Sequence, residues 1–328
     1  MASRTVEDFV AAIRAGDRRA VARAITLLES TLAEDTALGR EILEALVPDT
    51  GSAIRVGITG PPGVGKSTFI ETFGLHVLSE GRRVAVLAVD PTSPLSGGSI
   101  LGDKTRMERL AHAEGAFIRP SPSGGSLGGV GHRTREAMLL CEGAGYDVIL
   151  IETVGVGQSE VTVRSMVDFF TVLLQPGAGD ELQGIKRGLL ELADALVVTK
   201  ADGDQKALAE RTQAEHRQAL QLLRPPYVEW KPPVLTVSSL VGEGIPEVWE
   251  AVLAHRNALT ETGALQARRQ RQARDWMWSQ VQEGLERAFR ADPAVASAIP
   301  VLEREVEASQ TTPAAGARRL LEAFRKPV

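Results

Sequence analysis

The pattern of hydrophobic and polar positions divides the chain into three parts. Before residue 50, apolar residues recur at helical spacing, which predicts amphipathic helices. From residue 53 onward, short runs rich in Val, Ile and Leu alternate with helical patterns, as is typical of a parallel sheet covered on both faces. After residue 246 the pattern is helical to the end. We therefore predict three segments: a helical N-terminal extension at 1–50, an α/β domain at 51–256 and a C-terminal helical arm at 257–328.

Capping signals mark the first two helices. Thr5 and Asp8 have the spacing of a capping box, and Asp17 is a typical N-cap for a second helix. A third helical stretch ends before Pro48. These segments carry no catalytic signature, so we expect them to pack against the α/β domain.

The middle of the chain contains six apolar runs that are predicted as strands. The stretch 120–131, rich in Gly, Pro and Ser, is predicted as a long loop of functional interest. The predicted strands are 54–59, 83–89, 147–152, 169–175, 195–199 and 234–237.

A glycine-rich motif follows the first strand directly. It has the G-x-x-x-x-G-K-S order of a phosphate-binding loop between a strand and a helix. Its glycines let backbone N–H groups approach phosphate oxygens, and a helix N-terminus favours negative charge. We expect Lys66 to reach the β- and γ-phosphates and the Ser67 hydroxyl to bind Mg²⁺. The fold class is therefore α/β: a P-loop NTPase with a mostly parallel central sheet flanked by helices, plus helical N-terminal and C-terminal extensions. The motif comprises Gly60, Pro61, Pro62, Gly63, Val64, Gly65, Lys66 and Ser67.

A second motif bears on the choice of base. Thr199, Lys200 and Asp202 come directly after the apolar residues 195–198, in the position where guanine-binding proteins usually carry Asn-Lys-x-Asp. The Asp carboxylate accepts hydrogen bonds from guanine N1–H and the exocyclic amine, which adenine cannot offer. Thr199 in place of Asn resembles the motif of signal-recognition GTPases. The short loop Ser238, Ser239 and Leu240, which follows the last strand, fits the segment that closes over guanine.

Metal and γ-phosphate contacts are predicted at another strand end. Glu152 ends the strand at 147–152, and Gly155 follows it in the sequence, where its backbone N–H could contact the γ-phosphate. Because the usual residue is Asp, we expect Glu152 to contact Mg²⁺ through a water molecule. Asp90 and Asp103 are further candidate metal residues, although either could be an ordinary N-cap or turn aspartate.

Composition narrows the remaining possibilities. The 37 basic and 42 acidic residues give a net charge of −5, so nucleic acid and membrane surfaces are not expected partners. Cys141 is the only cysteine, which excludes an intrachain disulfide. The sequence shows neither an apolar run of membrane-spanning length nor a signal peptide, so we expect a cytoplasmic protein. A basic patch at Arg268, Arg269, Arg271 and Arg274 is interpreted as a solvated helix face or a subunit contact.

With these motifs in place, the chain resembles the MeaB/ArgK-type GTPases, the G-protein chaperone family of adenosylcobalamin-dependent acyl-CoA mutases. The resemblance is strong over residues 50–250 and covers the helical flanks only in general plan. It is carried by four segments: 60–68, 88–107, 152–160 and 175–188.

The resemblance implies a role for each matching residue. Lys66, Ser67 and Thr68 would bind phosphate and Mg²⁺, and Asp90, Asp103 and Glu152 would surround the metal. The segment 175–188 matches a third switch that rearranges when the mutase binds. In it, Gln183 would orient water or phosphate and Lys186 would stabilise charge that develops on the γ-phosphoryl group.

The activity implied is a Mg²⁺-dependent hydrolysis of GTP to GDP and phosphate, slow in isolation because no activating arginine is evident near the loop. The biological role implied is gated delivery of cobalamin to a methylmalonyl-CoA mutase or a relative, with protection or reactivation of that enzyme. Implied partners are the mutase, a cobalamin adenosyltransferase and a second copy of this chain, paired through the C-terminal helical arm.

Three other readings stay open. An ATP-dependent kinase linked to amino-acid transport would be favoured by preferential ATP binding. A metallochaperone GTPase would require a His and Cys cluster, whereas the chain has five scattered His and one Cys. A scaffold that binds GTP without hydrolysis would release no phosphate with or without a mutase.

Overall fold

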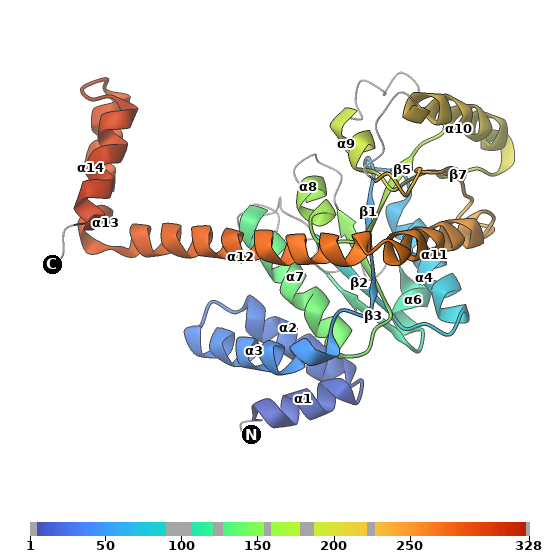
Figure 1. The fold of residues 1–328 in the computed structure, drawn as a ribbon, viewed down its shortest axis with the longest axis horizontal. Coiled ribbons are helices and arrows are strands. Elements are labelled where there is room, and N and C mark those ends of the chain that lie inside the picture. Colours follow the sequence, from blue (N-terminus) through green and yellow to red (C-terminus); the bar gives the residue numbers. More distant parts are fainter. Residues whose placement is uncertain are drawn as a thin grey trace. The chain divides into compact units, whose positions relative to one another are not determined.

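The structure is a computed structural model, and it describes residues 5–89, 107–120, 127–153, 159–177, 187–221 and 227–325. A seven-stranded sheet lies at the centre of the described residues, with strand order β3-β2-β4-β1-β5-β6-β7 (Figure 1). Every neighbouring pair is parallel, as the near-continuous apolar runs predicted. The strands are β1 (Ile54–Thr59), β2 (Val84–Val89), β3 (Ala116–Arg119), β4 (Val148–Thr153), β5 (Phe169–Leu174), β6 (Ala195–Val198) and β7 (Val234–Thr236).

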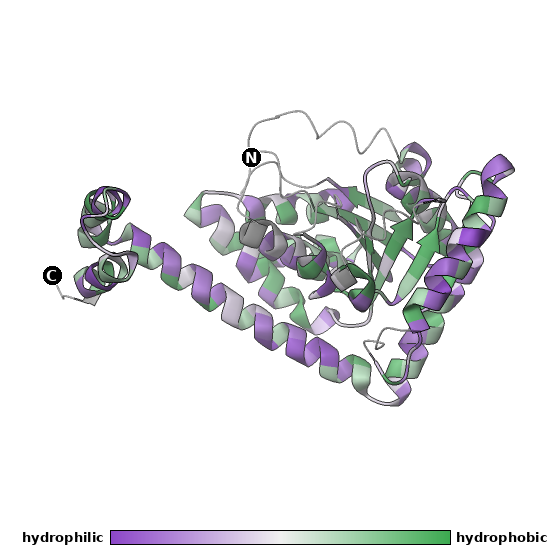
Figure 2. Ribbon diagram, turned by 90° about the horizontal axis from the view of Figure 1, so that it is seen from above, coloured by the Kyte–Doolittle hydropathy of each residue, from purple (hydrophilic) through white to green (hydrophobic). Residues whose placement is uncertain are grey.

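Helices cover both faces of the sheet. One face packs against α7 (Leu127–Gly143), α8 (Ser159–Arg164), α9 (Arg187–Leu192) and α10 (Lys206–Gln221). The other packs against α4 (Lys66–Ser79), α6 (Glu108–His112) and α11 (Ile245–Glu261). In Figure 2 the strands are mostly green, which is the hydropathy expected of strands buried on both faces.

The N-terminal extension is helical and packs on the α/β domain as predicted. It consists of α1 (Val6–Arg14), α2 (Arg18–Glu29), α3 (Ala33–Leu46) and the short helix η1 (Val47–Asp49). The predicted capping box at Thr5 and Asp8 is present, and the Asp17 side chain accepts from two backbone N–H groups of α2. Both caps are local in sequence, which is why the sequence reveals them.

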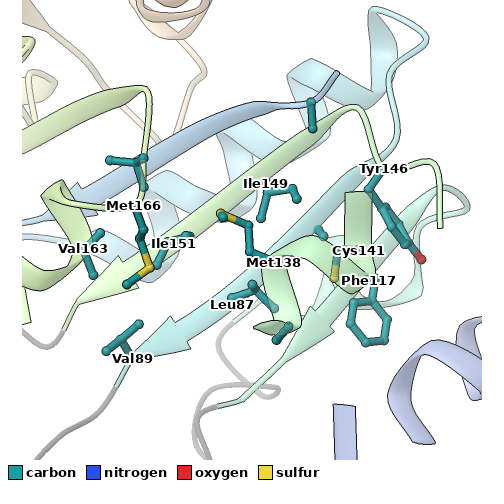
Figure 3. Close-up of a cluster of buried hydrophobic side chains, with 14 of the residues drawn as sticks. Leu87, Val89, Phe117, Met138, Cys141, Tyr146, Ile149, Ile151, Val163 and Met166 are labelled. Carbon is teal, nitrogen blue, oxygen red and sulfur yellow. The ribbon is translucent and has the colours of Figure 1, made fainter. Parts of the chain in front are cut away.

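One prediction about the middle of the chain is wrong, and one strand was missed. The stretch 120–131 is not a loop throughout, because α7 begins at Leu127. Strand β3 was not predicted, since four residues that end in Arg119 show too little periodicity to be recognised. The hydrophobic cluster between β2, β3, β4 and α7, which includes Phe117, Met138 and Cys141, is drawn in Figure 3.

The C-terminal part is helical and consists of α12 (Ala264–Ala291), α13 (Pro293–Glu307) and α14 (Pro313–Arg325). Contacts divide the chain into one compact unit at residues 1–269 and a second at 270–328. In the second unit α13 packs against α14, and Phe289 meets Phe324 edge-on with ring centroids 5.3 Å apart. The predicted boundary at residue 256 stays a prediction.

The basic patch on α12 needs a correction. Arg268 is buried, and Arg269 donates hydrogen bonds to the carboxylate of Asp168. These two residues therefore do not belong to a solvated helix face. Within the described part of the chain, no helix is both long enough and apolar enough to cross a membrane.

Candidate functional site

The phosphate loop lies between β1 and α4, as the motif predicts. Gly63 and Gly65 have φ values of +79° and +96°, a left-handed region that favours glycine. Gly60 has no room for a side chain, because a Cβ there would lie 2.8 Å from the carbonyl oxygen of Leu173 on β5. The loop geometry therefore requires glycine at three of the motif positions.

Helix α4 starts at Lys66, and its N-cap residue Gly65 provides no side-chain hydrogen bond. The first N–H groups of a helix have no partner within the helix, so this N-terminus suits an anion. The Lys66 ammonium donates to the carbonyl oxygens of Gly60 and Pro61, at 2.9 and 3.2 Å. It thus lies against the loop that would surround the phosphates. Ser67 and Thr68 follow in the first turn of α4.

Glu152 lies on the side of the sheet that α4 covers. It is in register with Ile58 on β1 and Ala88 on β2. Side chains alternate along a strand, so Glu152 shares the face of Leu150, and Leu150 and Ile58 belong to the core cluster that includes residues of α4. A serine hydroxyl at the helix start and a carboxylate on the same face form an oxygen donor set of the kind Mg²⁺ prefers. The residues present therefore fit this ion.

The predicted base loop contacts the phosphate loop directly. The Thr199 hydroxyl donates to the carbonyl oxygen of Val64 at 2.7 Å, and the Lys200 ammonium donates to that of Gly63 at 2.8 Å. Thr199 is 2% exposed, and Lys200 adopts φ +56°, which is uncommon for a residue other than glycine. Thr199 thus fastens the base loop to the phosphate loop with its hydroxyl.

Asp202 is held by the loop after β7. The Ser238 hydroxyl donates to one carboxylate oxygen of Asp202 at 2.5 Å, and Ser238 is fully buried. The loop closes tightly because Gly244 lies against β7, where a Cβ would come within 2.1 Å of the Thr236 carbonyl oxygen. A carboxylate has several acceptor positions, so one oriented in this way can still accept from a base.

The rest of the closing loop is tied to α4. The Thr72 hydroxyl donates to the carbonyl oxygen of Ser239 at 2.8 Å. The side chain of Leu240, in the same loop, is 78% exposed. Thr72 was not predicted as part of the site, because nothing in its sequence context distinguishes it from other polar helix positions.

A buried hydroxyl pair was also missed. Thr153 donates to Thr59 at 2.7 Å, and both side chains are fully buried. These residues are the last of β4 and β1, so the pair joins the strand that carries Glu152 to the strand that leads into the phosphate loop. Their common position at strand ends is the signal that could have revealed them.

The structure brings the predicted phosphate, base and closing-loop residues together at the carboxyl ends of the strands, where open α/β sheets bind ligands. Among these residues, the carbonyl oxygen of Pro62 also accepts a hydrogen bond from the side-chain amide of Gln175, at 3.5 Å. The other predicted site residues lie outside the described part of the chain: Asp90, Asp103, Gly155, Gln183 and Lys186.

Comparison with known proteins agrees with this geometry. The chain is 58% identical to a putative GTPase of Caulobacter vibrioides over 94% of its own length and 95% of the relative. It is 47% identical to the methylmalonic aciduria type A homolog, mitochondrial, of Mus musculus, over 98% of this chain and 80% of that one. A crystal structure described as LAO/AO transport system kinase is 40% identical, with a TM-score of 0.78 and 98% of each chain covered.

The fold, the phosphate loop and the base loop define a P-loop GTPase that hydrolyses GTP to GDP with Mg²⁺ as its cofactor. Residues 21–294 match the family described as methylmalonyl Co-A mutase-associated GTPase MeaB. The chain belongs to this family, which confirms the predicted resemblance.

Proposed function

We propose that this GTPase is a chaperone of an adenosylcobalamin-dependent acyl-CoA mutase, methylmalonyl-CoA mutase or a relative. GTP binding and hydrolysis would gate delivery of the cobalamin cofactor, and would protect or reactivate the mutase. The match of residues 21–294 to a family described as mutase-associated carries this proposal. A cobalamin adenosyltransferase is a further proposed partner, and the cytoplasm is the proposed location.

The proposed chemistry is in-line attack of water on the γ-phosphate. The N–H groups of the loop and of the α4 N-terminus, with Lys66, would bind the triphosphate and stabilise the charge that develops on its oxygens. Ser67 and Glu152, joined by Asp90 and Asp103, would hold Mg²⁺, which when bound neutralises part of the phosphate charge. Gly155 would contact the γ-phosphate, while Thr199, Lys200 and Asp202 would hold the guanine.

Stimulation by the mutase would depend on the segment 175–188. We propose that Lys186 adds positive charge beside the γ-phosphoryl group in the mutase complex and that Gln183 orients water or phosphate there. Because one cation at a transferring phosphoryl group contributes about 10³-fold or more to the rate, its loss is measurable.

The experiment measures phosphate release with and without a purified acyl-CoA mutase. We expect wild type to be stimulated, and Lys186→Ala to keep its GTP affinity and basal rate but lose most of the stimulation. Lys231→Ala, which removes an exposed lysine elsewhere, should behave as wild type. Full stimulation of Lys186→Ala would remove Lys186 from the mechanism, and no stimulation of wild type by any mutase would contradict the chaperone role.

We also propose that two copies pair through the C-terminal helices. The outer part of α12 exposes large apolar side chains, which monomeric proteins seldom gather on one helix. These side chains, between 41% and 60% exposed, are Met277, Trp278, Val281 and Leu285.

A kinase that uses ATP is the second candidate, because one similar crystal structure is described as a transport system kinase. Asp202, held in place by Ser238, would favour guanine over adenine, since a carboxylate that faces bound adenine would lack hydrogen-bond donors. The two candidates therefore differ in the base they select, and nucleotide binding separates them.

A further inference from the structure

A buried cluster of charged side chains lies at the opposite edge of the sheet from the nucleotide site. We call it the amino-edge cluster, because Asp168 and Asp194 directly precede β5 and β6. Both carboxylates are almost completely buried, at 3% and 0% exposure. The cluster consists of Arg164, Asp168, Asp194, His255, Arg268 and Arg269.

Asp194 is shared by cations from two helices. Arg164, the last residue of α8, approaches its Oδ2 at 3.1 Å and donates to its Oδ1 at 3.2 Å. Arg268, in the first turns of α12, lies 3.8 Å from Oδ2. The backbone N–H of Phe170 also donates to Oδ2, at 2.9 Å, which fixes the carboxylate to β5. Asp194 therefore lies between the end of α8 and the start of α12.

Arg268 also donates to the backbone carbonyl oxygen of Asp168, at 2.5 Å, and the neighbouring residue on α12 binds the side chain of that same aspartate. Arg269 donates to both carboxylate oxygens of Asp168, at 2.8 and 2.5 Å, and to the carbonyl oxygen of Ala53 at 2.6 Å. None of these partners lies on α8. Arg268 and Arg269 thus fasten the same helix to the same compact unit, but only Arg268 reaches a carboxylate that α8 also uses.

Helix α8 connects this cluster to the nucleotide site. It begins at Ser159, and the strand before it in the chain, β4, carries Glu152 as its second-last residue. It is packed closely on two sides: a Cβ at Gly57 of β1 would lie 2.9 Å from Val163, and one at Gly131 of α7 would lie 2.5 Å from Thr162. A short helix held this tightly shifts as one body, because packed interiors do not deform continuously.

Breaking a buried ion pair is costly, so the partners of Asp194 should stay together when α8 shifts. In GTPases, loss of the γ-phosphate reorders switch segments and the elements packed against them. A shift of α8 in such a change would reach Arg164, then Asp194, and then Arg268.

We infer that Asp194 couples α8 to the first turns of α12, so that the start of the C-terminal helix responds to whether GTP or GDP is bound. The inference rests on the GTPase activity and does not require the mutase. Arg164 and Arg268 act as positioning residues on the two sides of one carboxylate. The response would enter α12, the helix that continues into the C-terminal unit.

Hydrogen exchange on the full chain tests this coupling. Amide exchange in peptides that cover residues 262–275 is compared between the Mg²⁺–GDP state and the state with a non-hydrolysable GTP analogue. We expect a several-fold difference in exchange rate between the two states in wild type. Arg268→Met should abolish the difference, because the methionine fills the space but cannot reach Asp194 electrostatically.

Arg269→Met is the matched control. It loosens the same helix, so exchange should rise in both states, yet the difference between the states should remain. Nucleotide affinities of both variants should equal that of wild type. If the Arg268→Met variant fails to fold, the Asp194→Asn variant takes its place and should likewise abolish the difference between the two states. The inference is overturned if wild type shows no difference, if Arg268→Met keeps it, or if Arg269→Met loses it as well.

Discussion

At the residue scale, the proposed selection of guanine depends on how the carboxylate of Asp202 is held. Asp202 alone could rotate, but the hydrogen bond from Ser238 fixes one of its oxygens. Thr199 fastens the same loop to the phosphate loop through Val64. A threonine hydroxyl therefore supplies the connection between the two loops in the place where an asparagine is usual.

Removal of this hydrogen bond should weaken guanine binding selectively. For Ser238→Ala we expect about tenfold lower GDP affinity, because a hydrogen bond to a charged group contributes about 1.5 kcal/mol or more. ADP affinity should change little, so the ratio of GDP affinity to ADP affinity should fall. The neighbouring Ser239→Ala, whose backbone carbonyl makes the contact to Thr72, should bind like wild type by calorimetry. Equal affinities for Ser238→Ala and wild type would contradict the role of Ser238.

At the element scale, the sequence predicted those features whose causes are local. Six strands were recognised because both faces are buried and the apolar runs are nearly continuous. The start of α7 was missed because Leu127 is followed by glycines, which disfavour helices in isolation. Gly131 is nevertheless required, since any side chain there would collide with Thr162 of α8. Such a requirement comes from a distant element and leaves no local pattern.

The same reasoning explains why the amino-edge cluster and part of the nucleotide site could not be predicted from the sequence. Arg268 was interpreted as a surface residue because its partners precede it by many residues in the chain, and charge alone does not reveal pairing. The phosphate loop and Asp202 were predictable from the sequence because their spacing is fixed by the ligand. The contact of Ser238 with Asp202 and the contact of Thr72 with Ser239 could not be predicted, since both depend on how the loop after β7 folds back.

At this scale we also predict how the stability of the fold depends on pH, because the buried residue His255 packs α11 against the sheet. Its ring meets Phe169 and Trp230 edge-on, with centroids 5.1 Å away in each case, and lies 3.7 Å from Asp194. Burial, with the nearby charge of Arg164, lowers the pKa of His255 to about 4. Burial also raises the pKa of Asp194 to about 7, against the charge of Arg164.

The two groups act in opposite directions. His255 stabilises the fold fully above pH 6.5 and loses this contribution as pH falls toward 4, up to about 3 kcal/mol. The contribution of Asp194 is full below pH 3.8 and is lost as pH rises toward 7. Urea unfolding between pH 4 and 7 should therefore show a steeper acid loss of stability in wild type than in His255→Gln. Parallel stability profiles would show that His255 does not titrate as inferred.

At the scale of the whole molecule, the chain combines a nucleotide-binding unit with a helical unit that exposes large apolar side chains. Along α12 in Figure 2, purple and green segments alternate, whereas the strands are mostly green. The nucleotide unit explains GTP hydrolysis, and the exposed apolar residues of the helical unit explain why we propose self-association. The coupling through Asp194 would place the start of α12 under nucleotide control.

Self-association should depend on the apolar stripe of α12. For Leu285→Glu we expect the dimer dissociation constant to rise at least about tenfold, because a charge would be buried in an apolar contact. Ser279→Glu adds the same charge at an exposed polar position on another side of the helix and should leave association unchanged. Sedimentation equilibrium measures both variants. A monomeric wild type, or unaltered association of Leu285→Glu, would contradict pairing through this helix.

The central claim is that one site binds a triphosphate through the Lys66 loop and selects guanine through Asp202. Calorimetric titration with GTP, GDP, ATP and ADP in the presence of Mg²⁺ tests it most directly, with Lys66→Ala as the control that removes the phosphate contact. We predict that wild type binds the guanine nucleotides at least about a hundredfold more tightly than the adenine nucleotides, because adenine lacks the donors that Asp202 requires. Lys66→Ala should lose tight binding of all four. Equal or tighter binding of ATP, or unchanged GTP affinity in Lys66→Ala, would contradict the account.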